Sequence, residues 1–288
     1  MSKKNLRDIL ILLGIIVACA IAARTLKGHE TLDEYAKKNA ASSSSASEAS
    51  STSNDSSNSA KEASSQEEAS ADAASSASTE PAYAPHSKDA VIYAEGFNYE
   101  PIYDEIYERI KDVSYPEGCE IKLDDLRYCR VLYVDFEGET QNGELICSKA
   151  IADDVMEIFY ELYRNGYQIE SMRLIDDFGG DDNAAMEANN TSCFNYRNIG
   201  KSKKLSNHSR GLAIDINPLY NPQVKYKNGQ KTISPASGAE YADRSASFPY
   251  KIDSEDLAYK LFKEHGFTWG GNWNSSKDYQ HFEKTIFK

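Results

Sequence analysis

A long serine-rich segment limits how much of this chain can fold. Between Ala41 and Ser78, nearly half of the positions are serine, with scattered acidic residues and no aromatic side chain. Such a segment buries too little apolar surface to offset the conformational entropy that ordering costs. We therefore expect residues 30–88 to be a disordered linker and residues 89–288 to form one globular domain. A domain of about 200 residues can bury a substantial core without disulfide bonds.

The first 29 residues carry the pattern of a membrane anchor or an export signal. Three basic residues within positions 3–7 precede an apolar run from Ile9 to Ala23. Our first interpretation of residues 1–29 is a single transmembrane helix. A lipoprotein signal is an alternative, because residues 16–19 (Ile-Val-Ala-Cys) resemble a lipobox, and a cleaved signal peptide is a third. All three predict a domain outside the cytoplasm, and the first two hold it at the cell membrane.

Charge and cysteine content narrow the class of protein. The formal net charge is −13, and no run of Lys and Arg is present to neutralise phosphates, so we expect no nucleic-acid partner. The spacings of the five cysteines match no zinc-knuckle pattern. Four of them fall in the predicted domain, and the sequence does not choose among their possible disulfide pairings. We expect a monomer.

The hydrophobic periodicity of residues 89–288 predicts both helices and strands. Helical spacing of apolar residues predicts helices over 102–113, 152–164 and 254–265, the last capped by Asp253 or Ser254. Alternating patterns predict strands over 128–136, 144–148, 169–175, 267–269 and 281–287, with a turn at Gln141–Gly143 after the first. Helices that pack against a small, mainly antiparallel sheet define an α+β fold.

The chain has five histidines, and two of them, His208 and His281, lie within distinctive sequence motifs. His265 ends a predicted helix, where the helix dipole accounts for it. His208 lies in SNHSRGLAID, whose apolar alternation predicts a strand that carries Asp215 into the interior, and His281 lies in DYQHFE. A buried carboxylate needs a strong partner, of which a metal is the commonest. Two imidazoles and a carboxylate leave one position of a tetrahedral zinc ion for water, as in catalytic sites, and Asp278 is placed to take a proton from that water.

The combined motifs resemble a known family. SxHxxGxAxD followed by [DE]xxHFE is similar to the zinc D-Ala-D-Ala carboxypeptidases of the VanY and VanX type, whose fold is shared with the hedgehog signalling domain. Relatives include L-alanyl-D-glutamate endopeptidases of phage lysins, whose base is also Asp. The resemblance covers roughly residues 126–287. It implies a hedgehog/D,D-peptidase-like fold, zinc held by His208, Asp215 and His281, Asp278 as general base and later proton donor, and Ser206 as a substrate-binding residue.

One part of the family pattern is missing. These enzymes carry a substrate-polarising arginine in an upstream Ser-Gly-Tyr-Arg-Ser segment, which this chain lacks. Arg197 is our first candidate to bind the substrate carbonyl or carboxylate and Arg173 our second, with a surface salt bridge as the alternative for each. Trp269 and Trp273 are expected in the core and in the substrate groove wall rather than in a carbohydrate platform, with Trp269 as a substrate-binding candidate. The acidic run over residues 176–182 is expected to be a solvated turn, with a calcium site as the alternative.

The motifs predict an enzyme that hydrolyses the stem peptides of peptidoglycan, with D-alanyl-D-alanine carboxypeptidase as the leading activity. An L-alanyl-D-glutamate endopeptidase is the first alternative. The others are a zinc-bound module that binds wall peptides or a protein partner without turnover, and a structural wall-tethering protein in which the site is incidental. For His208 with Asp215 alone, a hydrogen-bonded core pair is the alternative to a metal site. The presence of Asp278 beside His281 favours an enzyme, because a proton shuttle at this position serves catalysis.

Overall fold

The computed structural model describes residues 85–200, 202–227 and 229–286. The predicted anchor over residues 1–29 and all but the last few residues of the predicted linker lie outside this part of the chain, so both stay predictions. Within the described part, no helix combines the length and the apolar character needed to cross a bilayer.

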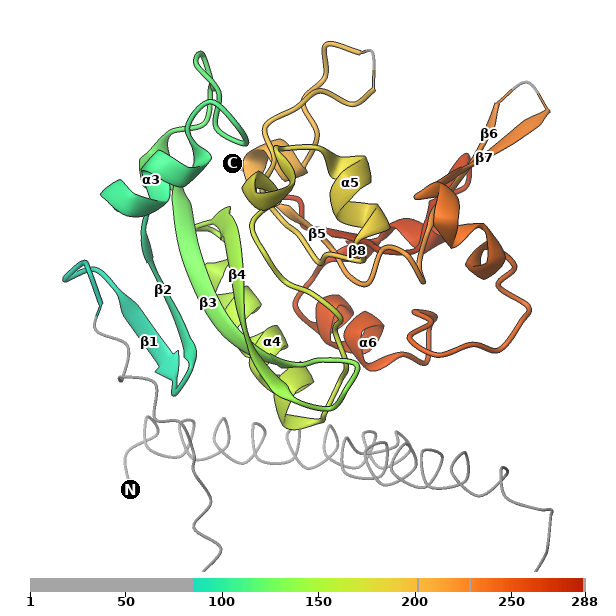
Figure 1. Cartoon of the computed structure of the whole chain (residues 1–288), viewed down its shortest axis with the longest axis horizontal. Helices are drawn as coiled ribbons and strands as arrows, with labels where there is room; N and C mark the ends of the chain where they lie inside the picture. The colour runs from blue at the N-terminus through green and yellow to red at the C-terminus, as the bar shows by residue number, and fades with distance from the viewer. Residues whose placement is uncertain (1–84, 201, 228, 287–288) are drawn as a thin grey trace, which may run out of the picture. The chain divides into compact units, whose positions relative to one another are not determined.

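The two longest strands, β3 (Leu126–Val134) and β4 (Thr140–Ser148), belong to a four-stranded antiparallel sheet. Its order is β1 (Val91–Ala94), β2 (Phe97–Pro101), β3 and β4. Helix α4 (Ala152–Arg164) covers one face of this sheet with its apolar stripe (Figure 1). Helix α3 (Asp104–Ile110) packs Ile106 and Ile110 into a cluster with Leu126, Tyr128 and Ile146. Burial of these apolar side chains stabilises the contact between α3 and the sheet.

Two small antiparallel sheets follow in the C-terminal half. One has the order β5 (Ala213–Asp215), β10 (His281–Glu283) and β8 (Thr268–Trp269), and the other has the order β7 (Gln230–Ser234), β6 (Gln223–Lys227) and β9 (Ser276–Asp278). Helix α6 (Leu257–Glu264) stacks Phe262 on Phe282 of β10, with ring centroids 4.4 Å apart. Helix α5 (Asp182–Glu187) lies between the two halves (Figure 1).

The predicted α+β class with a small antiparallel sheet is confirmed, and helix 152–164 is observed with its predicted bounds. The predicted turn at Gln141–Gly143 is wrong, because these residues belong to β4 and pair with β3. The chain reverses earlier instead. There, the Asp135 carboxylate accepts hydrogen bonds from the backbone N–H groups of Glu137 and Glu139, and Gly138 adopts a φ of 86°. Aspartate and glycine favour such a reversal more strongly than Gln-Asn does.

Two other predicted elements differ from the structure. Residues 169–175 contain one isolated bridge, between Ser171 and Asn190, rather than a strand. The Asn190 side chain accepts hydrogen bonds from the Ser171 hydroxyl and the Arg173 backbone N–H, which would otherwise be open to a neighbouring strand. Helix α6 begins at Leu257, since Asp256, rather than Asp253 or Ser254, accepts the two N–H bonds that cap it. The Asp253 carboxylate closes a local turn to Glu255 instead.

Candidate metal centre

A tight contact between a turn and the large sheet positions His208. The residue opens a short 3-10 turn, His208–Arg210, which ends at Gly211 with a φ of 62°. The Gly211 carbonyl accepts a hydrogen bond of 2.8 Å from the Ser148 backbone N–H. A Cβ atom on Gly211 would lie 2.5 Å from that nitrogen, so only glycine permits both the backbone angle and the approach. Strand β5 then starts at Ala213 and carries Asp215 to the site.

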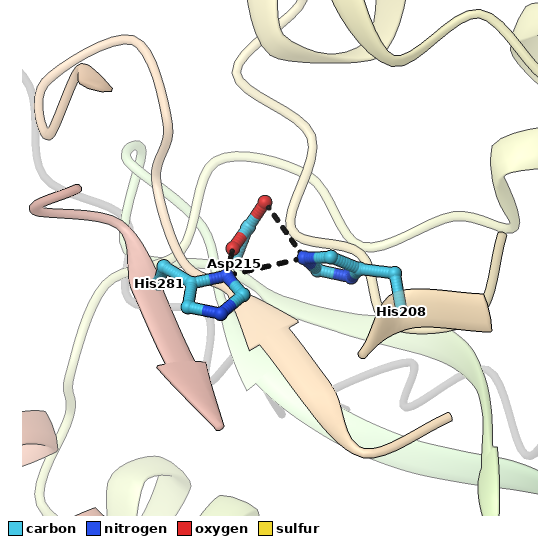
Figure 2. Close-up of side chains that lie close together, drawn as sticks. All are labelled: His208, Asp215 and His281. Atoms are coloured by element: carbon cyan, nitrogen blue, oxygen red, sulfur yellow. Dashed lines mark hydrogen bonds and ion pairs between the residues drawn. The ribbon is translucent and has the colours of Figure 1, made fainter. Parts of the chain in front are cut away.

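The pairing of β5 with β10 brings Asp215 and His281 together. The register places His281 directly opposite Asp215 and Phe282 opposite Ile214. Ile214 and Phe282 are fully buried, so they hold the two strands against the core. The side chains of Asp215 and His281 consequently project on the opposite face of the small sheet, toward the turn that carries His208 (Figure 2).

The donor atoms of the three side chains converge on one point. His281 Nδ1 lies 2.9 Å from Asp215 Oδ1, and His208 Nε2 lies 3.3 Å from Asp215 Oδ2 and 3.2 Å from His281 Nδ1 (Figure 2). A tetrahedral zinc ion with bonds of about 2.0–2.1 Å requires ligand atoms roughly 3.3 Å apart. The donor set therefore has the types and the separations of such a site. Among the described residues, it is the group of His, Cys, Asp and Glu side chains close enough to hold a metal.

The outer ring nitrogens of both histidines have partners that set their orientation. His208 Nδ1 donates to the Cys193 carbonyl over 2.6 Å, and His281 Nε2 donates to Glu283 Oε2 over 3.1 Å. Asn207 in turn donates to Glu283. With these protons on the outer nitrogens, a metal that displaced the proton His281 Nδ1 shares with Asp215 would be met by the lone pairs of His208 Nε2 and His281 Nδ1. The sequence analysis did not single out Glu283, although it stands two residues after His281 on a strand and so shares its face.

Burial and mutual contacts shift the charges of the site. Burial alone would raise the pKa of Asp215, but the two imidazoles outweigh it and hold that pKa well below its usual range. Burial likewise opposes protonation of His281, yet hydrogen bonds to Asp215 and Glu283 raise its pKa to about 10. Glu283 has a lowered pKa, chiefly because it accepts from His281. The polypeptide thus concentrates negative charge around two imidazoles, an environment that favours a cation.

Asp278 enters the same pocket from β9. It is 6% exposed, and its strand partner Gln223 donates an amide N–H to Asp278 Oδ2. The other oxygen, Oδ1, is buried and has no hydrogen-bond partner among the described residues. Burial raises the pKa of Asp278 to about 7, with Asp215 adding to the rise and His281 opposing it. A carboxylate with a pKa near neutrality suits a group that takes up and releases a proton.

A cavity of about 520 Å³ opens over the three donors and Asp278. Ser206 lines it, and its hydroxyl accepts a hydrogen bond from the His208 backbone N–H. Arg197 lines it as well and forms an ion pair with Asp182. Both residues therefore lie beside the site, and their roles in substrate binding stay predictions.

Arg173 and Trp269 are not among the residues that line this cavity. Arg173 pairs with Asp177 at 2.9 Å on the surface, which is the salt bridge considered as its alternative. Trp269 is 7% exposed and donates its indole N–H to the Tyr279 carbonyl, so it belongs to the core. Trp273, four residues later, is the tryptophan in the cavity wall.

Other polar candidates are accounted for by local contacts. In the acidic run, Asp176 binds the Ser114 hydroxyl and backbone N–H, and Asp181 caps α5. The run therefore serves structural hydrogen bonds, and it does not appear as a metal-binding group among the described residues. His265 follows α6 and lies 3.1 Å from Asp154 of α4, an ion pair added to the expected contact with the helix end.

Comparison with known proteins assigns a class to this site. A family model described as D-alanyl-D-alanine carboxypeptidase matches residues 200–284, the segment that holds His208, Asp215, Asp278 and His281. The match supports a peptidase, which is a hydrolase. The matched family is the one that the two motifs resemble, so the resemblance is confirmed over this segment. No curated protein and no solved structure matches the chain.

Proposed function

We propose that this protein is a zinc-dependent D-alanyl-D-alanine carboxypeptidase that removes the terminal D-alanine from peptidoglycan stem peptides. The observation that carries the proposal is the convergence of His208, Asp215 and His281 within 4.8 Å beside the buried carboxyl group of Asp278. The family match to residues 200–284 supports the same activity.

Zinc is the metal that this donor set fits. Two neutral imidazoles and one carboxylate are typical of catalytic zinc, whereas calcium and magnesium prefer sites made of oxygen ligands. The ion would be held by His208 Nε2, an Asp215 oxygen and His281 Nδ1. Hydrogen bonds to the Cys193 carbonyl and the Glu283 carboxylate would fix the orientations of the two imidazole rings. When bound, zinc acts as a Lewis acid and activates water near neutral pH.

Asp278 is the general base in the proposed reaction. Its ionised carboxylate removes a proton from the attacking water as the new C–O bond forms at the scissile carbonyl carbon. The same carboxyl group then donates that proton to the amine nitrogen as the C–N bond breaks, so the base is regenerated. A positioned acid–base group of this kind contributes about 100- to 10,000-fold to the rate. Gln223 holds one carboxylate oxygen, which orients the other for proton transfer.

Ser206 and Arg197 are the proposed substrate contacts. Arg197 is the arginine of the cavity wall, and its ion pair with Asp182 limits the directions in which the guanidinium can point. A guanidinium in this position would stabilise the negative charge that develops on the substrate carbonyl oxygen. Arg173 is not proposed for this role, because it does not line the cavity.

Mass spectrometry of a stem pentapeptide and of intact muropeptides tests the proposal. The full-length protein should release one alanine from the C-terminus, and Asp278→Asn, which keeps the shape of the side chain, should release none at a comparable rate. Cleavage after L-alanine would replace the proposed activity with that of an endopeptidase. Zinc binding without any cleavage would identify a wall-binding module instead.

We also propose that residues 1–29 hold the protein at the cell membrane and that residues 30–88 tether the domain outside the cytoplasm. The basic and then apolar pattern of the first segment and the serine-rich composition of the second support this arrangement. Membrane fractionation of the full chain and of a variant that lacks residues 1–29 tests it. Recovery of both in the soluble fraction would contradict an anchor.

A further inference from the structure

Three arginine and lysine side chains line the cavity. One of them lies on β6, the strand whose Gln223 contacts the proposed base Asp278. The three side chains are Arg197, Lys204 and Lys225. Arg197 is already paired with Asp182. Lys204 and Lys225 are exposed, and neither forms an ion pair with another residue that the structure describes. The cavity therefore offers two lysines whose charge is available to a ligand.

Lys225 shares a strand face with Gln223. Strand β6 pairs with β9 so that Gln223 stands opposite Asp278 and Lys225 stands opposite Ser276. Gln223 and Lys225 both line the cavity, whereas Val224 between them is 3% exposed and packs into the core. Alternate residues of a strand lie about 7 Å apart on the same face. An extended lysine side chain covers a similar distance, so the Lys225 ammonium can reach the space beside Asp278.

The chemistry of peptide hydrolysis defines what occupies that space. Asp278 returns its proton to the leaving amine, so this side of the cavity must receive the amino acid that is released. In a peptide cut at its C-terminal bond, that amino acid bears a free carboxylate one carbon away from the amine. In a peptide cut at an interior bond, a neutral amide stands in the same place. A lysine here therefore distinguishes the two kinds of substrate by charge.

We propose that Lys225 binds the C-terminal carboxylate of the substrate and thereby restricts the enzyme to the ends of stem peptides. This inference rests on the proposed peptidase function and adds the residue that selects the substrate. Lys204 also lines the cavity but comes from the loop that precedes Ser206 and is not part of the β6–β9 strand pair, so the role is assigned to Lys225.

Two pentapeptide stems that differ only at the C-terminus test the proposal, one with a free carboxylate and one with a carboxamide. Wild-type protein should cleave the free acid with a kcat/KM about 10-fold above that of the amide, the size expected for a hydrogen bond to a charged group. Lys225→Met should remove this preference by raising KM for the acid, with no change for the amide. Lys204→Met, which removes an equal charge from the same cavity, should retain the preference.

The outcomes separate this inference from the function on which it rests. If Lys225→Met keeps the preference for the free acid, or lowers kcat/KM equally for both peptides, Lys225 does not bind the substrate carboxylate. If wild-type protein cleaves both peptides equally well, the inference fails while the peptidase function stands. If it cleaves neither, the proposed function fails and the inference fails with it.

Discussion

His281 and Asp215 stand directly opposite each other on two antiparallel strands, with His281 Nδ1 2.9 Å from Asp215 Oδ1. This cross-strand pair joins residues that are 66 positions apart in the chain. His208 completes the group from a turn that is anchored to β4. The metal centre thus depends on one strand register and on one turn, and the predictions below test each of these dependences.

Loss of the Asp215 carboxylate should remove the metal. Wild-type protein is expected to carry about one zinc per chain, and a chelator should abolish peptide cleavage until zinc is restored. Asp215→Asn should purify without stoichiometric zinc and without activity. Metal analysis by plasma mass spectrometry provides the measurement, and Asp177→Asn, which changes a carboxylate outside the cavity, is the control. Full zinc occupancy in Asp215→Asn would contradict the assigned ligand set.

Glu283→Gln should weaken metal binding without removing a ligand. The carboxylate fixes the ring of His281 through its Nε2–H and increases the basicity of the coordinating nitrogen. Loss of such an outer partner typically costs about 10- to 100-fold in metal affinity. Competition with a zinc-binding dye measures the change. Glu264→Gln, at an exposed position of α6, should bind zinc like the wild type.

Gln223→Met should shift the pH dependence of cleavage. The Gln223 amide donates to the ionised Asp278 carboxylate and therefore lowers its pKa, so removal of the donor should raise that pKa. Because Asp278 must be ionised to accept a proton, the acidic limb of the kcat/KM profile should move to higher pH. A profile from pH 5 to 9 with the stem pentapeptide tests this. An acidic limb that moves to lower pH would contradict the assigned role of Asp278.

Asp256→Asn should stabilise the protein at high pH. Burial raises the pKa of Asp256 in the folded state to about 7, above its unfolded value, so the folded state binds this proton more tightly. Stability from this group is complete at low pH and is lost as the pH rises toward 7. Asparagine cannot ionise but keeps an oxygen to cap α6. Urea unfolding at pH 8 should therefore show a gain on the order of 2 kcal/mol, and no gain near pH 4.

A control of opposite sign is available for that experiment. Asp243 has a lowered pKa because its carboxylate accepts hydrogen bonds from Ser245. Its contribution to stability is present above its unfolded pKa and is lost as the pH falls. Asp243→Asn should consequently destabilise the protein at pH 8. Destabilisation by both variants at pH 8 would contradict a raised pKa of Asp256.

Gly211→Ala should destabilise the fold and disrupt the metal centre. The positive φ costs a non-glycine residue about 1 kcal/mol, and the new Cβ would lie 2.5 Å from the Ser148 nitrogen. We expect a total loss of about 2–4 kcal/mol by urea unfolding. Gly166→Ala has a similar φ of 64° but meets no atom within 4 Å, so it should show the conformational cost alone. Equal losses in the two variants would mean that the close approach to β4 is unimportant.

The sequence by itself determined the candidate donor set and some of the fold. The motifs around His208, Asp215 and His281 contain the three side chains that the structure brings together, because side-chain type and local context mark potential zinc ligands. Helix 152–164 follows from local periodicity, since its apolar stripe and the glycine after it are both encoded within the segment. Two local patterns gave wrong predictions. The Gln-Asn-Gly sequence predicted a turn but belongs to β4, and the alternation over residues 169–175 predicted a strand that does not form.

Only the tertiary structure decided which residues surround the donors. Gln223 meets Asp278, and Glu283 meets Asn207, through contacts between segments distant in the chain. The placement of Arg173 outside the cavity likewise depends on packing. Local periodicity specifies which face of a strand is apolar, but the register between strands is set by the packing of the whole core, and a shift of one residue would turn Asp215 away from His281.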